Sequence, residues 1–317
     1  MMTNIFCCPD CLTKLFFKNN IAECNKCHRA FSRKFDIYRI LPSSLSDNKI
    51  KEDEVYNLKN LDNSWYNNRI WYYLIHLSSH IVRFEEHFLN KINGPRVLEL
   101  ASGNGWASML IKRAHPEFEV YSTDVSFNSL KIQGGQMSKI MEVKPDYFIV
   151  CDAEKLPFED NSFDTVFVIA SIHHFFDISQ ALKEVKRVLK PGGLFIAADG
   201  MMPKIAGKLL GDEDSDRTKK FGILERKITF DEWLKYLDEA KIPRKSLKLN
   251  YDTHYLHTYP TNADERKLIR EGWFFNVAKE IIYGAFLSKM KQDMILRLGL
   301  TKLFPAGVVI EYQKERK

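Results

Sequence analysis

Two pairs of cysteines near the start of the chain have the spacing of metal ligands. Cys8 and Cys11 form one C-x-x-C pair, and Cys24 and Cys27 form a second. Each tight turn presents two sulfurs to one ion, and four thiolates complete the tetrahedral shell of a structural zinc ion. We therefore predict a Zn²⁺ site whose metal stabilises a small ribbon. His28 follows Cys27 directly and could replace it as the fourth ligand.

A second candidate site begins where an apolar run ends in a glycine turn. Residues 97–105 read VLELASGNG. Glycine at positions 103 and 105 lets the backbone approach a ligand closely, and the start of the following helix offers N–H groups to a carboxylate or phosphate. The next apolar run ends at Asp124, where a carboxylate can accept hydrogen bonds from ribose hydroxyls. A dinucleotide site would read G-x-G-x-x-G, but Ser108 stands at the third position.

Two later motifs decide between cofactor classes. Residues 151–164 read CDAEKLPFEDNSFD, and residues 188–193 read VLKPGG. With the E-x-x-x-G-x-G loop and the acid at position 124, they resemble the class I S-adenosylmethionine-dependent methyltransferases, especially the ubiquinone-biosynthesis-like branch. The resemblance covers about residues 95–200. It implies S-adenosyl-L-methionine as the cofactor and an α/β fold with a Rossmann-like, doubly wound, seven-stranded sheet.

The same resemblance implies roles for individual residues. Glu99 would orient the methionine amino group, Asp124 would bind the ribose diol, and Asp152 would accept a hydrogen bond from the adenine amino group. The remaining contacts would come from backbone near the cofactor, at Ala101, Gly103, Gly105, Ala153, Ala170 and Ser171. The family usually has glycine where this chain has Ala101. We expect binding to survive because alanine is tolerated where the backbone angles stay in the ordinary region.

Two histidines are the candidate catalytic residues. A sulfonium methyl group is already activated, so such an enzyme mainly aligns the reacting atoms, and it needs a base only if the acceptor holds its proton. His173 and His174 follow the predicted fourth strand, at the edge of the sheet where clefts open. One of them is predicted to face the acceptor as a base or hydrogen-bond donor. The alternative is that both only shape the loop.

The chain divides into a ribbon and a larger domain. Alternating strands and helices from residue 96 onward predict a parallel sheet. One helix is expected near residues 126–141, and a later one begins at Thr229, where Glu232 completes a capping box. The predicted parts are a zinc ribbon (1–42), a linker (43–60) and a methyltransferase domain (61–317) with a helical cap (61–92, two helices over 62–74 and 76–91), core (95–200) and substrate-side insertions (201–228 and 262–298). Because the linker is polar, we expect few contacts to cross it, and cofactor binding to persist without the ribbon.

The acceptor is a small molecule in the favoured interpretation, such as a lipid-like compound, a sugar or a natural product. A net charge of only +6 and an aromatic helical insertion favour it. The alternative is an RNA base, because the ribbon resembles those of rRNA guanine methyltransferases and of the small activator of tRNA methyltransferases. Residues 1–50 carry eight Lys or Arg and four acids, an excess that phosphate contacts would use. The histidine pair is not typical of those RNA enzymes.

Two further classes are less well supported. Intact cofactor motifs argue against a non-catalytic scaffold protein. No apolar run approaches the roughly 20 residues of a membrane span, and the start lacks the apolar stretch of a signal peptide. We therefore expect a cytoplasmic protein. The sequence does not predict an oligomeric state.

Overall fold

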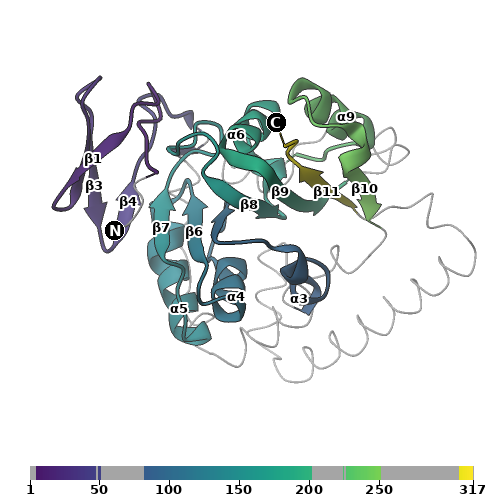
Figure 1. The fold of residues 1–317 in the computed structure, drawn as a ribbon, viewed down its shortest axis with the longest axis horizontal. Helices are drawn as coiled ribbons and strands as arrows, with labels where there is room; N and C mark the ends of the chain where they lie inside the picture. Colours follow the sequence, from purple (N-terminus) through teal and green to yellow (C-terminus); the bar gives the residue numbers. More distant parts are fainter. Residues whose placement is uncertain are drawn as a thin grey trace, which may run out of the picture.

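The fold is that of a computed structural model of the 317-residue chain (Figure 1). The structure describes residues 5–47, 49–50, 82–201, 224, 226–250 and 307–316. Several expected features lie outside these residues, namely the first cap helix (62–74), most of the insertion at 201–228 and the helical insertion at 262–298. The second cap helix, expected over residues 76–91, is described from Val82 onward.

One sheet of eleven strands runs through the described residues in the order β1-β2-β3-β4-β7-β6-β5-β8-β9-β11-β10. Its strands are β1 (Leu15–Lys18), β2 (Ile21–Cys24), β3 (Ala30–Lys34), β4 (Ile37–Arg39), β5 (Arg96–Glu99), β6 (Glu119–Asp124), β7 (Tyr147–Val150), β8 (Phe163–Ile169), β9 (Leu189–Gly200), β10 (Leu247–Asn250) and β11 (Gly307–Gln313).

The seven strands from β7 to β10 form the predicted doubly wound sheet. Strands β7, β6, β5, β8 and β9 are parallel neighbours, and β11 and β10 add two antiparallel pairings at the far edge. The central strands are apolar on both faces because helices cover both sides. The predicted fold class is confirmed, and the carboxyl ends of β5, β6 and β7 meet at one edge.

Helices cover the two faces of this sheet. In Figure 1, α4 and α5 lie on one side of the sheet, and α6 and α9 lie on the other. The helical segments are α3 (Val82–His87), η3 (Leu89–Lys91), α4 (Trp106–Ala114), the π-helical turn η4 (Ser129–Gly134), α5 (Gly135–Met141), η5 (Ile172–His174), α6 (Ile178–Val188), α9 (Phe230–Glu239) and η6 (Arg244–Ser246). None of the described helices is long and apolar enough to cross a membrane.

The ribbon extends the sheet of the larger domain. Strands β1 to β4 form an antiparallel meander, and β4 then pairs in parallel with β7, so that Ile37 lies opposite Phe148. The Ile40 N–H donates to the Val150 carbonyl and continues this pairing. Figure 1 shows the ribbon strands beside the β7 edge. The ribbon therefore covers a strand edge that would otherwise be exposed.

The expectation that few contacts link the two parts is wrong. The ring of Phe6 lies 5.5 Å from that of Phe158, 6.1 Å from that of Tyr121 and 6.2 Å from that of Tyr147, measured between centroids. The Cys7 N–H donates to the Pro157 carbonyl. Aromatic rings buried this way contribute much of the energy of a core. The ribbon and the larger domain share one hydrophobic cluster in the described residues.

Candidate cofactor and metal sites

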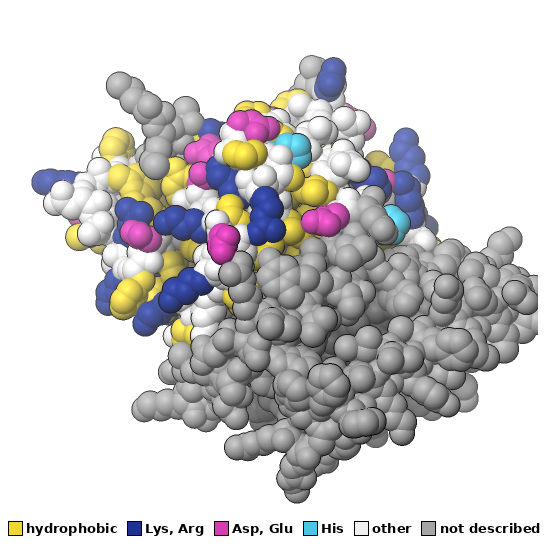
Figure 2. Space-filling model, turned by 90° about the horizontal axis from the view of Figure 1, so that it is seen from below, with side chains coloured by type: hydrophobic (Ala, Val, Ile, Leu, Met, Phe, Trp, Pro, Cys, Tyr) yellow, Lys and Arg dark blue, Asp and Glu magenta, His cyan; other side chains and the backbone are white. Residues whose placement is uncertain are grey.

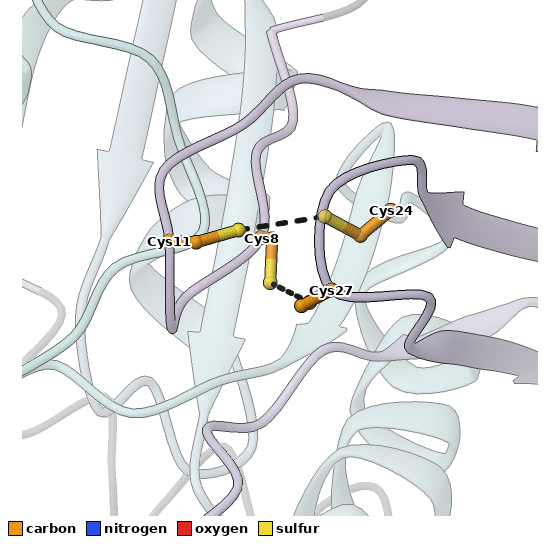
Figure 3. Close-up of side chains that lie close together, drawn as sticks. All are labelled: Cys8, Cys11, Cys24 and Cys27. Carbon is orange, nitrogen blue, oxygen red and sulfur yellow. Dashed lines mark hydrogen bonds between the residues drawn. The ribbon is translucent and has the colours of Figure 1, made fainter.

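The four predicted metal ligands meet in one cluster. The sulfurs of Cys8, Cys11, Cys24 and Cys27 all lie within 4.8 Å of one another. Figure 3 shows the two pairs entering from two facing turns, with sulfur separations of 3.5 Å between Cys8 and Cys27 and between Cys11 and Cys24. A zinc ion with bonds of about 2.3 Å would hold tetrahedral sulfurs roughly 3.8 Å apart. The donor set therefore fits a closed tetrahedral ion.

Two residues next to the cluster, His28 and Cys7, are not part of the ligand group found in the described residues. His28 is exposed in the turn after Cys27, with φ of 59°, and does not belong to the group of ligand atoms formed by the described residues. Cys7 is buried, and burial raises the pKa of its thiol to about 12. The geometry therefore favours Cys27 over His28 as the fourth ligand.

The glycine loop after β5 contacts the acid that ends β6. The Gly103 N–H donates to Oδ2 of Asp124 at 2.8 Å, and the Ser126 N–H donates to Oδ1 at 2.9 Å. Gly103 has φ of +56°, and a Cβ built there would meet no atom of the described residues within 4 Å. At Gly105, with φ of +72°, a Cβ would lie 3.0 Å from the Ser122 hydroxyl oxygen. Both glycines have left-handed backbone angles that favour glycine, and the loop at position 103 borders open space among the described residues.

Glu99 ends β5 beneath this loop and is buried. Its Oε2 accepts hydrogen bonds from the Ser108 N–H, at 3.0 Å, and from the Ser108 hydroxyl. Burial raises the pKa of the Glu99 carboxyl to about 8, although the two bonds from Ser108 act in the opposite direction. A buried acid of this kind can use a cationic ligand as its counter-charge.

The structure corrects the expectation about Ala101. Its φ is 49°, which is in the left-handed region and not in the ordinary one. Ala170, after β8, is also left-handed, with φ of 51°. The Ser171 hydroxyl donates to the Ala101 carbonyl at 3.1 Å and links the two loops. Non-glycine residues in this region cost about 1–2 kcal/mol each, and such strain is concentrated at functional sites.

Asp152 follows the end of β7, beside Asp124. The Cys151 N–H donates to the Asp124 carbonyl at 3.0 Å, so the two loops run side by side. Both Asp152 oxygens contact the ammonium group of Lys49, at 2.9 and 2.7 Å, and Lys49 also lies 2.9 Å from Glu154. Ala153, between the two acids, is half-buried. Sequence reasoning missed Lys49, because it lies in a polar segment far from the motif.

The histidine pair contains an acid–histidine contact. Nδ1 of His173 lies 2.7 Å from Oδ1 of Asp199, and the His173 N–H donates to Oδ2 at 3.1 Å. Burial of Asp199 favours its neutral form, but the electrostatic interaction with His173 and the hydrogen bonds that Asp199 accepts outweigh burial and lower the pKa of Asp199. Nδ1 of His174 lies 2.6 Å from the Leu224 carbonyl oxygen. Sequence reasoning missed Asp199, although its place at the end of β9 was a usable signal.

Comparison with known proteins identifies the domain. Residues 98–197 match the family described as "Methyltransferase domain". The chain contains a class I methyltransferase domain. This methyltransferase domain spans the glycine loop, both strand-ending acids and the histidine pair, so the resemblance inferred from the motifs is confirmed.

Curated relatives match the same part of the chain. The ubiquinone/menaquinone biosynthesis C-methyltransferase of Bordetella avium is 38% identical over 107 residues, which is 33% of this chain and 41% of that protein. A demethylmenaquinone methyltransferase of Staphylococcus aureus is 30% identical over 172 residues, which is 51% of this chain and 66% of that protein. The chain thus spans about half the length of the curated relatives it matches.

A solved structure supports the fold. A Haemonchus contortus phosphoethanolamine N-methyltransferase in complex with S-adenosyl-L-methionine superposes with a TM-score of 0.51 and 17% identity. The match covers 87% of this chain and 61% of that one. At this identity the likeness supports the shared methyltransferase fold and nothing more specific.

Proposed function

We propose that the chain transfers a methyl group from S-adenosyl-L-methionine to a small-molecule acceptor. The observation that carries this proposal is the juxtaposition of Glu99, Asp124 and Asp152 around a left-handed glycine loop at the carboxyl edge of the sheet. Ligands of open α/β sheets bind at this edge. The bound cofactor supplies the activated methyl group, and these residues bind and orient it.

The three acids suit a cofactor that carries positive charge. The buried carboxyl of Glu99 would balance the ammonium group of the methionine part, and Asp124 would accept from the ribose hydroxyls. Asp152 would accept from the adenine amino group. Gly103 leaves room for the ligand beside the loop, since no atom of the part of the chain that the structure describes lies within 4 Å of the position of a Cβ. Charge-assisted hydrogen bonds of this kind are about twice as strong as neutral ones.

Calorimetry with S-adenosyl-L-methionine tests the site. Asp124→Ala should weaken binding by about 2–4 kcal/mol, because two charge-assisted hydrogen bonds are lost. The matched control is Asp146→Asn. Asp146 precedes β7 at the amino ends of the parallel strands, where its side chain accepts a hydrogen bond from the Val120 N–H. This substitution should leave affinity unchanged. Unchanged affinity in Asp124→Ala would refute the site assignment.

His173 is the proposed base for an acceptor that holds its proton until methyl transfer. Asp199 would accept a hydrogen bond from the protonated Nδ1 of His173, which leaves the other ring nitrogen, Nε2, to accept the proton of the acceptor. Asp199 is thus a positioning residue. His173→Ala should lower the rate and flatten its pH profile, while His174→Ala should affect the rate less. Equal rates and pH profiles for wild type and His173→Ala would leave His173 with a loop-shaping role.

The metal proposal is one structural zinc ion per chain at Cys8, Cys11, Cys24 and Cys27. Four thiolates close the tetrahedral shell and leave no position for a substrate. Metal analysis of protein purified without chelator should find one equivalent of zinc. Cys27→Ser should lose zinc, and His28→Ala should retain it. The reverse pattern would establish a Cys3His site.

An RNA acceptor is the second candidate, and the ribbon surface favours it. Phe16 and Phe35 are exposed there, and the Lys131 ammonium lies 4.1 Å from the centroid of the Phe35 ring. On the face displayed in Figure 2, Lys and Arg side chains lie among hydrophobic and acidic ones in the described surface. Radiolabelled methyl transfer into small-molecule extracts or into RNA distinguishes the candidates. Acceptor binding that weakens steeply with salt would support RNA.

A further inference from the structure

One lysine connects the segment after the ribbon to the proposed adenine end of the cofactor site. The ammonium group of Lys49 contacts both oxygens of Asp152 and one oxygen of Glu154, all within 2.9 Å. The side chain of Lys49 is 14% exposed, and those of the two acids are 6% and 11% exposed. Ion pairs this well shielded hold geometry far better than surface pairs, because water competes little.

The chain leading to Lys49 is fixed to the ribbon. Asp10 lies between the two cysteines of the first turn, and its Oδ1 accepts from the Ser43 N–H at 3.0 Å and from the Ser43 hydroxyl at 3.2 Å. Arg29 pairs with Asp10 and donates to the Leu41 carbonyl at 3.0 Å. The path from the cysteine cluster to Lys49 is therefore held by polar contacts at its start.

Lys49 and an adenine can share Asp152. A carboxylate offers roughly four acceptor positions. Lys49 contacts one on each oxygen, and the Glu154 N–H donates to Oδ1 at 3.0 Å. Three positions are then used by the described residues, and Oδ2 keeps one acceptor position. Oδ2 is held in orientation by Lys49 and can accept a single further N–H.

We propose that Lys49 is a positioning residue of the cofactor site, which orients Asp152 for the adenine amino group and so links ribbon and cofactor. The inference rests on the proposed function, because it takes Asp152 as the adenine contact. It adds that the segment after the ribbon builds part of the cofactor site. Lys49 supplies the counter-charge for Asp152 and Glu154, and without it the two neighbouring carboxylates repel each other.

The test compares two ligands in a Lys49→Met variant. The probes are S-adenosylhomocysteine and its inosine analogue, in which a carbonyl oxygen replaces the adenine amino group. Wild type should bind S-adenosylhomocysteine at least about tenfold more tightly than the inosine analogue, because one hydrogen bond to a charged group contributes about this factor to affinity. Lys49→Met should lose most of this preference by weakening the first ligand alone. The ratio of two affinities in one preparation does not depend on the folded fraction.

Three further variants complete the design. Lys49→Arg keeps the charge and should retain part of the preference. Lys14→Met is the matched control, because Lys14 also makes an ion pair between the two parts. Its partner is Glu159 and not Asp152, and its side chain is half exposed. Lys14→Met should retain the full preference. In an Asp152→Asn background, Lys49→Met should cause no additional loss of preference.

The outcomes separate this inference from the proposed function. No binding of S-adenosylhomocysteine by wild type would contradict the proposed function itself. Normal binding with an unchanged preference in Lys49→Met would overturn the role of Lys49 alone. Equal weakening of both ligands would show a general structural role, and tighter binding of S-adenosylhomocysteine would show that Lys49 competes with adenine. Either of these results also overturns the inference.

Discussion

Two alanines, Ala101 and Ala170, hold left-handed backbone on the loops that follow β5 and β8. Both loops face the proposed cofactor site, and the Ser171 hydroxyl connects them through the Ala101 carbonyl. Each loop must reverse direction within a few residues of its strand. The chain therefore accepts backbone strain where the ligand is expected to bind, in a position where glycine would relieve it.

Ala101→Gly should raise the free energy of unfolding by about 0.5–1 kcal/mol, because relief of left-handed strain exceeds the entropic cost of glycine. Ala107→Gly is the matched control in the ordinary backbone of α4, and it should lower the free energy of unfolding by about 1 kcal/mol. Denaturant unfolding measures both. A loss of stability in Ala101→Gly would show that the alanine methyl group contributes more through packing than its backbone angle costs.

Cofactor binding should release a proton from Glu99 near neutral pH. The pKa of this carboxyl is raised to about 8, so at pH 7 it is mostly protonated in the folded chain. A cationic amino group beside it favours the ionised form. Affinity should therefore rise with pH up to about 8 and then level off. Calorimetry in buffers of different ionisation enthalpy measures the released proton, and Glu99→Gln should abolish both effects.

The same shift has a defined effect on stability. Between the ordinary value of 4.5 and about 8, the folded chain holds a proton that the unfolded chain has lost. The contribution of Glu99 to the free energy of unfolding is therefore largest at low pH and declines as pH rises through this window. Glu99→Gln should remove this part of the pH dependence.

Residues in short motifs could be predicted from the sequence, and residues that meet through folding could not. The four cysteines and the acids at the ends of β5 and β6 are recognisable because their spacing relates directly to one turn or one strand end. Asp199 and Lys49 lie 26 and 103 residues from their partners. Their contacts depend on the register of strands and on the docking of the ribbon, which local spacing does not encode.

At the scale of elements, the helix expected near residues 126–141 is present, because residues 127–141 are helical without interruption. Its middle is π-helical (η4, Ser129–Gly134) and its end is α-helical (α5, Gly135–Met141). A Cβ at position 134 would lie 3.3 Å from the ring of Phe148, so the helix packs closely against β7 where the π-helical part ends. Apolar periodicity predicted the helix but not the π-helical hydrogen bonding within it.

The capping box of α9 was predicted correctly, and its contribution to the free energy of unfolding can be measured. The Thr229 side chain accepts from the Glu232 N–H, and the Glu232 carboxylate accepts from the Thr229 N–H. Thr229→Ala should lower the free energy of unfolding by about 1 kcal/mol, whereas Thr229→Ser should retain the cap. Equal stability of the two variants in denaturant unfolding would mean that packing of Trp233 alone fixes the start of this helix.

At the scale of the whole molecule, the ribbon and the methyltransferase domain form one sheet and share a core. Composition predicted a polar linker between them, but β4 lies before that linker and pairs with β7. Phe6→Ala should lower the free energy of unfolding by about 3–5 kcal/mol, because its ring packs against Phe17 of the ribbon and Phe158 of the larger domain. Phe16→Ala, in an exposed ribbon position, should change it by less than about 1 kcal/mol. Unfolding should stay a single transition.

Removing the proposed zinc should therefore affect the cofactor site as well as the ribbon. The cysteine cluster holds the turns that carry Asp10, and Asp10 fixes the segment leading to Lys49. Chelation should lower the melting temperature of the whole chain and weaken S-adenosylhomocysteine binding by about tenfold, and added zinc should restore both. Cys24→Ser should behave like the chelated protein, whereas Cys7→Ala should keep its zinc. If chelated protein binds with unchanged affinity, the ribbon is an independent module and the coupling through Lys49 does not operate.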